Sequence, residues 1–226
     1  MNALILAAGA GTRLNSNLPK SLLRVGGMTI LERTVLSLEQ IGVKRENITA
    51  VAGFRHELLH RACLKADVSA VNNPLWRFPG TYSSFYAPGK WSGEVLIVHG
   101  DLLWERGLLS GIRDVPGDIV VPVDPGSRFD PEAMKTETRG GKVLHLSKHL
   151  PVSRSAGESM GIFLIREPAL LRNMSTHLLY KLQASLDDAV NIAAGRMRVE
   201  AFFTGKSAWE EVDTPVDLNR ARELFS

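Results

Sequence analysis

Short apolar runs alternate with amphipathic helical patterns in this chain, and that alternation constrains the fold more than any other feature. Apolar runs of strand length occur at 4–6, 48–51, 68–71, 94–98 and 118–123. Between them, apolar residues recur at helical spacing over 29–41 and 57–64. Such alternation is typical of βαβ units, whose parallel strands are covered by helices on both faces. We therefore expect a Rossmann-like three-layer α/β/α fold around a mixed, mostly parallel sheet.

The pattern changes after residue 124. Segments 134–138, 143–147 and 160–165 are typical of strands in a small antiparallel lobe, because turn-forming Gly and Pro residues separate them. Helical patterns follow at 168–174, 185–194 and 215–225, and a further strand is expected at 199–203. No repeat or linker interrupts the chain. We predict a single domain over residues 1–226, with one half at 1–124 and a second half, ending in a closing helix, at 125–226.

The composition excludes several classes of protein. The chain has 226 residues, 44% hydrophobic and 23% charged, as in an ordinary globular domain. Its formal net charge is only +3 and no basic run occurs, so we expect no nucleic-acid partner. Residues 1–8 lack the charged start of a signal peptide, and no apolar stretch reaches the roughly 18 residues that span a bilayer. The single Cys63, which we expect in the core, excludes an internal disulfide. We expect a cytoplasmic protein with no membrane partner.

The strongest local signal is the segment that follows the first apolar run. Small residues at 7–12 allow a ligand to approach the backbone, and two glycines in that stretch allow successive N–H groups to point inward. Arg13 and Lys20 add two positive charges close by. The segment lacks the Gly-Lys-Ser/Thr of a Walker loop, and Leu14 stands where a dinucleotide fingerprint would have glycine. We predict a polyphosphate-binding loop.

This loop resembles the signature of the nucleotidyltransferases that join a nucleoside triphosphate to a phosphorylated small molecule. The resemblance extends along nearly the whole chain and favours the phosphocholine and phosphonate cytidylyltransferase branch of the sugar-phosphate nucleotidyltransferase superfamily. The similar segments are Leu4-Ile5-Leu6-Ala7-Ala8-Gly9-Ala10-Gly11-Thr12-Arg13, Pro19-Lys20, 51–57, Asn72-Asn73-Pro74, 96–101, Met134-Lys135, 157–161 and 209–215.

The resemblance implies an enzyme that transfers CMP from CTP to a small anionic phosphonate or phosphorylated acceptor and releases pyrophosphate. Residues 1–124 would bind the nucleotide and residues 125–226 the acceptor. Arg13 and Lys20 would be catalytic, because they neutralise charge on the transferring phosphate. The implied nucleotide-binding residues are Leu6, Ala7, Ala8, Gly9, Ala10, Gly11, Thr12, Arg13, Lys20, Gly53, Asn73, Ser84, Gly100 and Asp101.

The resemblance also implies a Mg²⁺ site formed by Asp101 and Asp213. Asp101 follows an apolar strand, at the edge where α/β sheets bind ligands, and Asp213 precedes a helix start at Thr214-Pro215. Two carboxylates from distant segments, together with phosphate oxygens, are a usual ligand set for this ion. Either aspartate could instead cap a turn or the last helix, and His99 could be a base or a structural residue.

The acceptor residues are the least determined. A quaternary ammonium would require aromatic faces, and aromatic residues cluster at Trp76, Phe78, Tyr82, Phe85, Tyr86 and Trp91, where packing is the alternative role. We name Tyr82, Trp104, Lys135 and Glu158 as candidate acceptor-binding residues. Arg77, Arg128, Lys135 and Arg154 would suit an acceptor with an additional negative group, although they could be ordinary surface charges. The branch commonly has an asparagine ahead of Ser83-Ser84, and its absence here leaves the ligand contact of that loop open.

Other interpretations fit parts of the same pattern. A sugar-1-phosphate nucleotidylyltransferase using UTP, dTTP or CTP would have almost the same loop. A molybdenum-cofactor-type nucleotidyltransferase is disfavoured by Glu158 and by the segment 209–215. A non-catalytic nucleotide-binding regulatory subunit would not be expected to keep Arg13, Lys20, Asp101 and Asp213 together. A homodimer is compatible with all of these interpretations.

Overall fold

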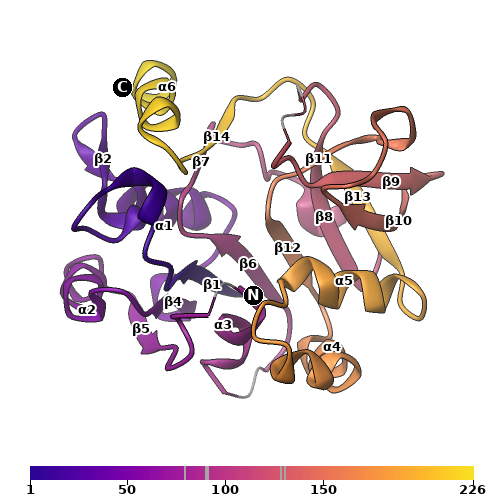
Figure 1. Cartoon of the computed structure of the whole chain (residues 1–226), viewed down its shortest axis with the longest axis horizontal. Helices are drawn as coiled ribbons and strands as arrows, with labels where there is room; N and C mark the ends of the chain where they lie inside the picture. The colour runs from indigo at the N-terminus through magenta and orange to yellow at the C-terminus, as the bar shows by residue number, and fades with distance from the viewer. Residues whose placement is uncertain (79, 90–91, 128, 130) are drawn as a thin grey trace.

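The computed structural model describes residues 1–78, 80–89, 92–127, 129 and 131–226. One sheet of ten strands runs through the described part of the chain, in the order β11-β9-β10-β13-β8-β12-β6-β1-β4-β5 (Figure 1). Its parallel part consists of β6 (Val95–His99), β1 (Asn2–Ala7), β4 (Ile48–Ala52) and β5 (Ser69–Asn72). The predicted α/β architecture and these predicted strands are confirmed.

Both faces of the sheet are covered, as the alternation predicted. Ala3, Ile5 and Ala7 of β1 pack into one hydrophobic cluster with α1 (Ile30–Gln40) and α2 (His56–Lys65). Leu4 and Leu6 pack into the cluster on the opposite face. That second cluster includes α3 (Tyr82–Tyr86), α4 (Pro168–Ser175) and α5 (Leu186–Ala194). Cys63 is fully buried in the first cluster, as expected, and burial raises the pKa of its thiol to about 11.

The predicted antiparallel strands extend the same sheet (Figure 1). β12 (Ile162–Ile165) runs antiparallel to both β6 and β8 (Ile119–Asp124), and β13 (Val199–Phe203) is parallel to β8. β9 (Lys135–Arg139) and β10 (Lys142–Ser147) form a hairpin. Its turn is Gly140-Gly141, where φ values of 59° and 86° favour glycine. The short strand β11 (Gly157–Ser159) pairs with both β8 and β9.

Several short elements lie outside the sequence predictions. β2 (Arg24–Val25) pairs with β3 (Met28–Thr29), and β7 (Leu102–Trp104) pairs with β14 (Trp209–Glu211). The second pairing brings the segment after β6 beside the segment that precedes α6 (Pro215–Phe225), and the Val212 N–H donates to the Asp101 carbonyl at 2.9 Å. The 3₁₀ turns are Thr12–Leu14, Lys20–Leu22, Arg45–Asn47, Ile112–Asp114, Val152–Arg154 and Thr176–Tyr180.

None of the described helices combines the length and the apolar character needed to cross a bilayer.

Candidate active site

Backbone hydrogen bonds connect the end of β1 and the loop after it to the segments that follow β4 and β6. The Ala8 carbonyl accepts a hydrogen bond from the Phe54 N–H, and the Leu6 carbonyl accepts one from the Gly100 N–H, both at 2.9 Å. Gly11 has φ 58°, in the left-handed region. A Cβ at this position would lie 2.7 Å from Cγ of Lys20. Gly11 therefore has two constraints, because it must turn the loop and leave room for the Lys20 side chain.

Lys20 lies at the centre of an ion-pair network. Its ammonium donates to Asp101 at 2.8 Å and also to Asp213, and its side chain is only 17% exposed. Arg13 contacts the second oxygen of Asp213 at 2.5 Å. Burial alone would lower the pKa of Lys20, but the charges and hydrogen bonds of the two carboxylates raise it above its usual value. Lys20 is therefore a permanent cation at the loop.

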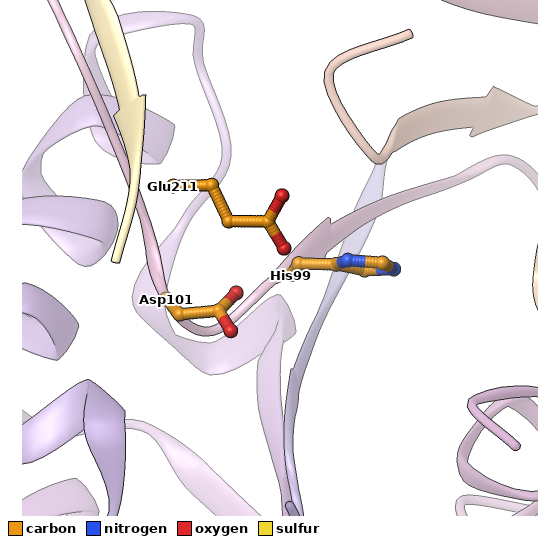
Figure 2. Close-up of side chains that lie close together, drawn as sticks. All are labelled: His99, Asp101 and Glu211. Carbon is orange, nitrogen blue, oxygen red and sulfur yellow. The ribbon is translucent and has the colours of Figure 1, made fainter. Parts of the chain in front are cut away.

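The carboxylates around Lys20 form a donor set suited to a hard divalent cation. Asp101 follows β6 and Asp213 follows β14, and His99 and Glu211 lie close to them. Ligand atoms of His99, Asp101 and Glu211 are all within 4.8 Å of one another, and Figure 2 shows the Glu211 carboxylate pointing toward the other two residues. Residue Glu211 is exposed overall, but its carboxyl is enclosed by protein atoms. This enclosure and the nearby charges of Asp101 and Asp213 raise the pKa of Glu211 to about 8. Such an excess of negative charge fits Mg²⁺.

A cavity of about 460 Å³ joins the loop to these carboxylates, and we call it the main cavity. It is lined by eleven of the residues predicted to act in catalysis or in nucleotide, metal or acceptor binding: Leu6, Ala7, Gly9, Gly11, Thr12, Arg13, Lys20, Gly100, Asp101, Glu158 and Asp213. The structure thus brings together the predicted loop, both predicted catalytic cations, both predicted metal ligands and one predicted acceptor residue.

Five residues of the predicted nucleotide set do not line this cavity. Ala8 and Ala10 lie within the loop itself, between residues that line the cavity. Gly53 packs under the loop, where a Cβ would lie 2.5 Å from the Ala8 carbonyl oxygen. Asn73 and Ser84 are buried and contact each other, since the Asn73 amide donates to the Ser84 hydroxyl at 3.0 Å and to Ser83 at 2.9 Å. Asn73 and Ser84 therefore connect the end of β5 to α3.

Three of the four predicted acceptor residues face the protein interior. Tyr82 is buried in the second cluster, with its hydroxyl 2.5 Å from that of Ser175. Trp104 is buried in the first cluster. Lys135 is also buried, and its ammonium donates to the Ala133 carbonyl at 3.3 Å. Trp91 and Arg128, which were considered with them, lie outside the described residues.

A second cavity of about 460 Å³ adjoins the first, and we call it the acidic cavity. The two cavities share five residues, namely Arg13, Glu132, Glu158, Glu211 and Asp213. The aromatic residue in the wall of the acidic cavity is Trp209, whose indole N–H donates to Asp124 at 2.9 Å. Trp209 is the direct cross-strand neighbour of Trp104 in the β7–β14 pair.

Sequence reasoning missed several cavity residues. Trp209 and Glu211 lie within a segment that carried the resemblance, so that segment was the available signal. Ser21 and Ser159, which were missed, and His99, for which the sequence left a base or a structural role open, each place a buried polar atom without a hydrogen-bond partner among the described residues. All three residues line the main cavity, as do Lys148 and the buried carboxyl of Asp187.

Burial raises the pKa of Asp187, while the neighbouring His99 acts against that increase. No sequence pattern marked Asp187, because it is one of two adjacent aspartates at a helix start.

Comparison with known proteins adds the family context. Residues 3–212 match the family described as MobA-like NTP transferase domain. Over 99% of its length, the chain is 33% identical to a bifunctional IPC transferase and DIPP synthase from Rubrobacter xylanophilus. It is also 27% identical, again over 99% of its length, to a bifunctional IPC transferase and DIPP synthase from Aquifex aeolicus. It covers 52% and 51% of those proteins, so the chain spans about half the length of the curated relatives it matches.

Solved structures show the same fold. The inositol-1-phosphate CTP transferase from T. maritima superposes with a TM-score of 0.84 at 25% identity, covering 99% of this chain and 94% of that one. A putative glucose-1-phosphate thymidylyltransferase from Bacillus anthracis, solved with sucrose, gives a TM-score of 0.78 at 19% identity with the same coverage. The second likeness concerns the fold alone.

Proposed function

The chain belongs to the MobA-like NTP transferase domain family, and from this premise we propose that it transfers a cytidylyl group from CTP to the phosphate of a small phosphorylated polyol. The observation that carries the proposal is the convergence of Arg13, Lys20, Asp101 and Asp213 beside the loop in one cavity. Cations, backbone N–H groups and a carboxylate pair in one cavity suit the transfer of a nucleotidyl group.

The identity of the acceptor rests on the relatives and on the aromatic residues. The two curated relatives are bifunctional IPC transferases and DIPP synthases, and the solved relative is an inositol-1-phosphate CTP transferase. Tyr82 and Phe85, from the aromatic segment that could have held a quaternary ammonium, are buried in the core. Both points favour a phosphorylated polyol over the phosphonate or phosphocholine that the motifs alone suggested. We keep those two acceptors, and hexose 1-phosphates, as alternatives for the test.

The reaction requires no protein nucleophile, because the acceptor phosphate is already an anion. Its oxygen forms a bond to the α-phosphorus of CTP as the bond from that phosphorus to the bridging oxygen breaks, and pyrophosphate leaves. The loop N–H groups, Arg13 and Lys20 bind and orient the phosphates, and their charges offset the negative charge that develops. Asp101 and Asp213 would hold Mg²⁺, which supplies further neutralisation when it is bound.

We also propose a division of labour within the chain. Residues 1–124 contribute the loop, Lys20 and Asp101, and residues 125–226 contribute Glu158 and Trp209 of the adjoining acidic cavity. The division is not complete, because Asp213 of the second half contacts Lys20 of the first, and Arg13 and Asp124 of the first half line the acidic cavity. The two halves therefore meet at the carboxylate pair.

Pyrophosphate release tests the proposed function. With CTP and Mg²⁺ fixed, the acceptors would be inositol 1-phosphate, phosphocholine, 2-aminoethylphosphonate and several hexose 1-phosphates. The proposal expects the highest kcat/KM with the cyclitol phosphate, and CTP should exceed UTP, dTTP and ATP. Preferred turnover of a hexose phosphate or a phosphonate would replace the acceptor. Nucleotide-induced thermal stabilisation without pyrophosphate release from any acceptor would instead indicate a binding subunit.

A further inference from the structure

The acidic cavity carries an excess of negative charge. Among the described residues that line it, seven are carboxylates and two are arginines. Both arginines are already paired: Arg13 with Asp213, and Arg220 with Glu210 and Asp217, each pair within 2.7 Å. Lys20 and Lys148, which do not line this cavity, pair with Asp213 and Glu132, so the carboxyl groups still outnumber the cations. Asp124 and Glu158 are directly opposite each other in the β8–β11 pairing.

Hydrogen bonds hold this part of the wall in place. Asp124 accepts from the Trp209 indole N–H at 2.9 Å with one oxygen and from the Gly126 N–H at 2.8 Å with the other. Glu158 accepts from the Ser127 hydroxyl. Each carboxylate oxygen has two lone pairs, so Asp124 can accept further hydrogen bonds from a ligand. The wall thus presents oriented acceptors beside an indole, a combination that suits hydroxyl groups on a ring with an apolar face.

A second observation points to a ligand where the main cavity and the acidic cavity meet. Ser159, next to Glu158 in β11, is 5% exposed, and its hydroxyl has no hydrogen-bond partner among the described residues. Ser159 lines the main cavity, and Glu158 lines both cavities. A buried hydroxyl without a partner carries an energetic penalty that a ligand hydroxyl can remove. The two residues mark the passage between the reacting phosphate and the acidic cavity.

From this arrangement we propose that the body of the acceptor occupies the acidic cavity, where Trp209 and Asp124 contact the polyol and the acidic wall rejects a body with a second negative charge. The proposal rests on the proposed function, since it assumes that the acceptor phosphate lies in the main cavity. At about 460 Å³, the acidic cavity is within the usual size range of small-ligand sites. The charge of its wall argues against an acceptor with an additional carboxylate, the possibility that Arg77 and Arg154 had left open.

The first test compares acceptors that differ in one charge. Inositol 1-phosphate would be compared with an inositol bisphosphate, and a hexose 1-phosphate with the corresponding uronic acid 1-phosphate. We expect the neutral-bodied member of each pair to have at least a tenfold higher kcat/KM. The Asp124→Asn variant, which removes a negative charge but keeps a hydrogen-bonding group, should reduce that ratio severalfold. Equal use of both members by the wild-type protein, or an unchanged ratio in the variant, would overturn the proposal.

The second test separates binding of the acceptor from binding of CTP. Trp209→Phe keeps an aromatic face and removes the N–H that orients Asp124, so we expect KM for the acceptor to rise about tenfold and KM for CTP to stay within twofold. Trp104→Phe is the matched control, because this tryptophan lies directly opposite in the β-ladder and is buried in the core. A rise in KM for CTP in Trp209→Phe, or an equal rise for the acceptor in Trp104→Phe, would contradict the assignment.

A failure of the proposed function can be distinguished from a failure of this inference. If hexose phosphates are turned over in place of cyclitol phosphates, the proposed acceptor is wrong. The ratio of kcat/KM between the hexose 1-phosphate and its uronic acid counterpart then still tests whether the acidic cavity rejects added negative charge. If no acceptor is turned over, calorimetry with inositol 1-phosphate, in the presence of a non-hydrolysable CTP analogue, takes the place of kinetics. Binding that weakens about tenfold in Trp209→Phe supports the inference, and no binding, or binding unaffected by the substitution, overturns it.

Discussion

The two cavities of this site differ in how their residues are arranged along the chain. The main cavity draws most of its proposed phosphate-binding groups from residues 6–13 and Lys20, so a short stretch of the chain supplies backbone N–H groups and two cations. The acidic cavity shares Arg13 with it and otherwise draws on residues within 124–127, 132–133, 158 and 209–220, which the fold brings together. The comparison teaches that the charge-neutralising chemistry is encoded locally, whereas the proposed selection of the acceptor depends on tertiary structure.

The main cavity should therefore be the more sensitive of the two to removal of a single charge. Lys20→Ala is expected to lower kcat by a hundredfold or more, because a lost charged donor at the transferring group costs on the order of 3 kcal/mol of transition-state stabilisation. The accompanying loss of folding stability should be much smaller than this loss of transition-state stabilisation, so the melting temperature should change little. Steady-state kinetics and a thermal melt measure the two effects. Lys44→Ala, at an exposed ion pair with Glu46, is the control. Near-normal kcat in Lys20→Ala would remove Lys20 from the chemistry.

Asp213 tests the place where the two halves meet. Asp213→Asn removes one of two carboxylates proposed to hold Mg²⁺, so we expect about tenfold more Mg²⁺ for the half-maximal rate and a roughly tenfold to hundredfold lower kcat. A magnesium titration of pyrophosphate release measures both changes. Asp67→Asn, at an exposed position with φ 57° that asparagine tolerates, should leave the titration unchanged. An unaltered magnesium requirement in Asp213→Asn would mean that this aspartate serves only to pair with Arg13 and Lys20.

Glu211 lies on the border of both cavities and gives a prediction about pH. Its pKa is raised to about 8 in the folded protein, from about 4.5 in an unfolded chain, by burial and by Asp101 and Asp213. Between these values the folded state holds a proton that the unfolded state has lost, so stability falls as pH rises through this range. With EDTA present, Glu211→Gln should therefore melt a few degrees above the wild-type protein at pH 9 and close to it at pH 4.5. Melting curves that shift in parallel at both pH values would contradict this.

The same contrast explains how much could be predicted from the sequence. Strands and helices with several periodic residues were located correctly, and so was the loop at 7–13, since its two glycines and Arg13 lie within five residues. The strands β7 and β14 have three residues each, too few to show a period, yet they bring Asp101 and Asp213 together. For the aromatic residues at 82–86 the sequence left packing and ligand binding open, and the structure places Tyr82 and Phe85 in the core with α4 and α5. The sequence favoured Trp104 as an acceptor residue, and only the fold shows that Trp209 is the tryptophan that lines the acidic cavity.

The smallest predicted effect concerns two helix caps with the same geometry. Thr214 and Thr29 each form a capping box, with Asp217 at the start of α6 and Glu32 at the start of α1. Either Thr→Ala substitution should cost about 1 kcal/mol, or roughly 2–4 °C in melting temperature. Their effects on activity should differ, because Asp217 also accepts a hydrogen bond from the Asp213 N–H at 3.1 Å.

Loss of the α6 cap should therefore loosen a proposed metal ligand, and we expect a twofold to fivefold higher magnesium requirement in Thr214→Ala alone. Thermal melts and magnesium titrations of the two variants, side by side, make the comparison. Because the stability losses are matched, any difference in the titration reports on the position of Asp213 and not on general destabilisation. Equal magnesium requirements would show that Asp213 is held well enough by the β7–β14 pairing without the cap.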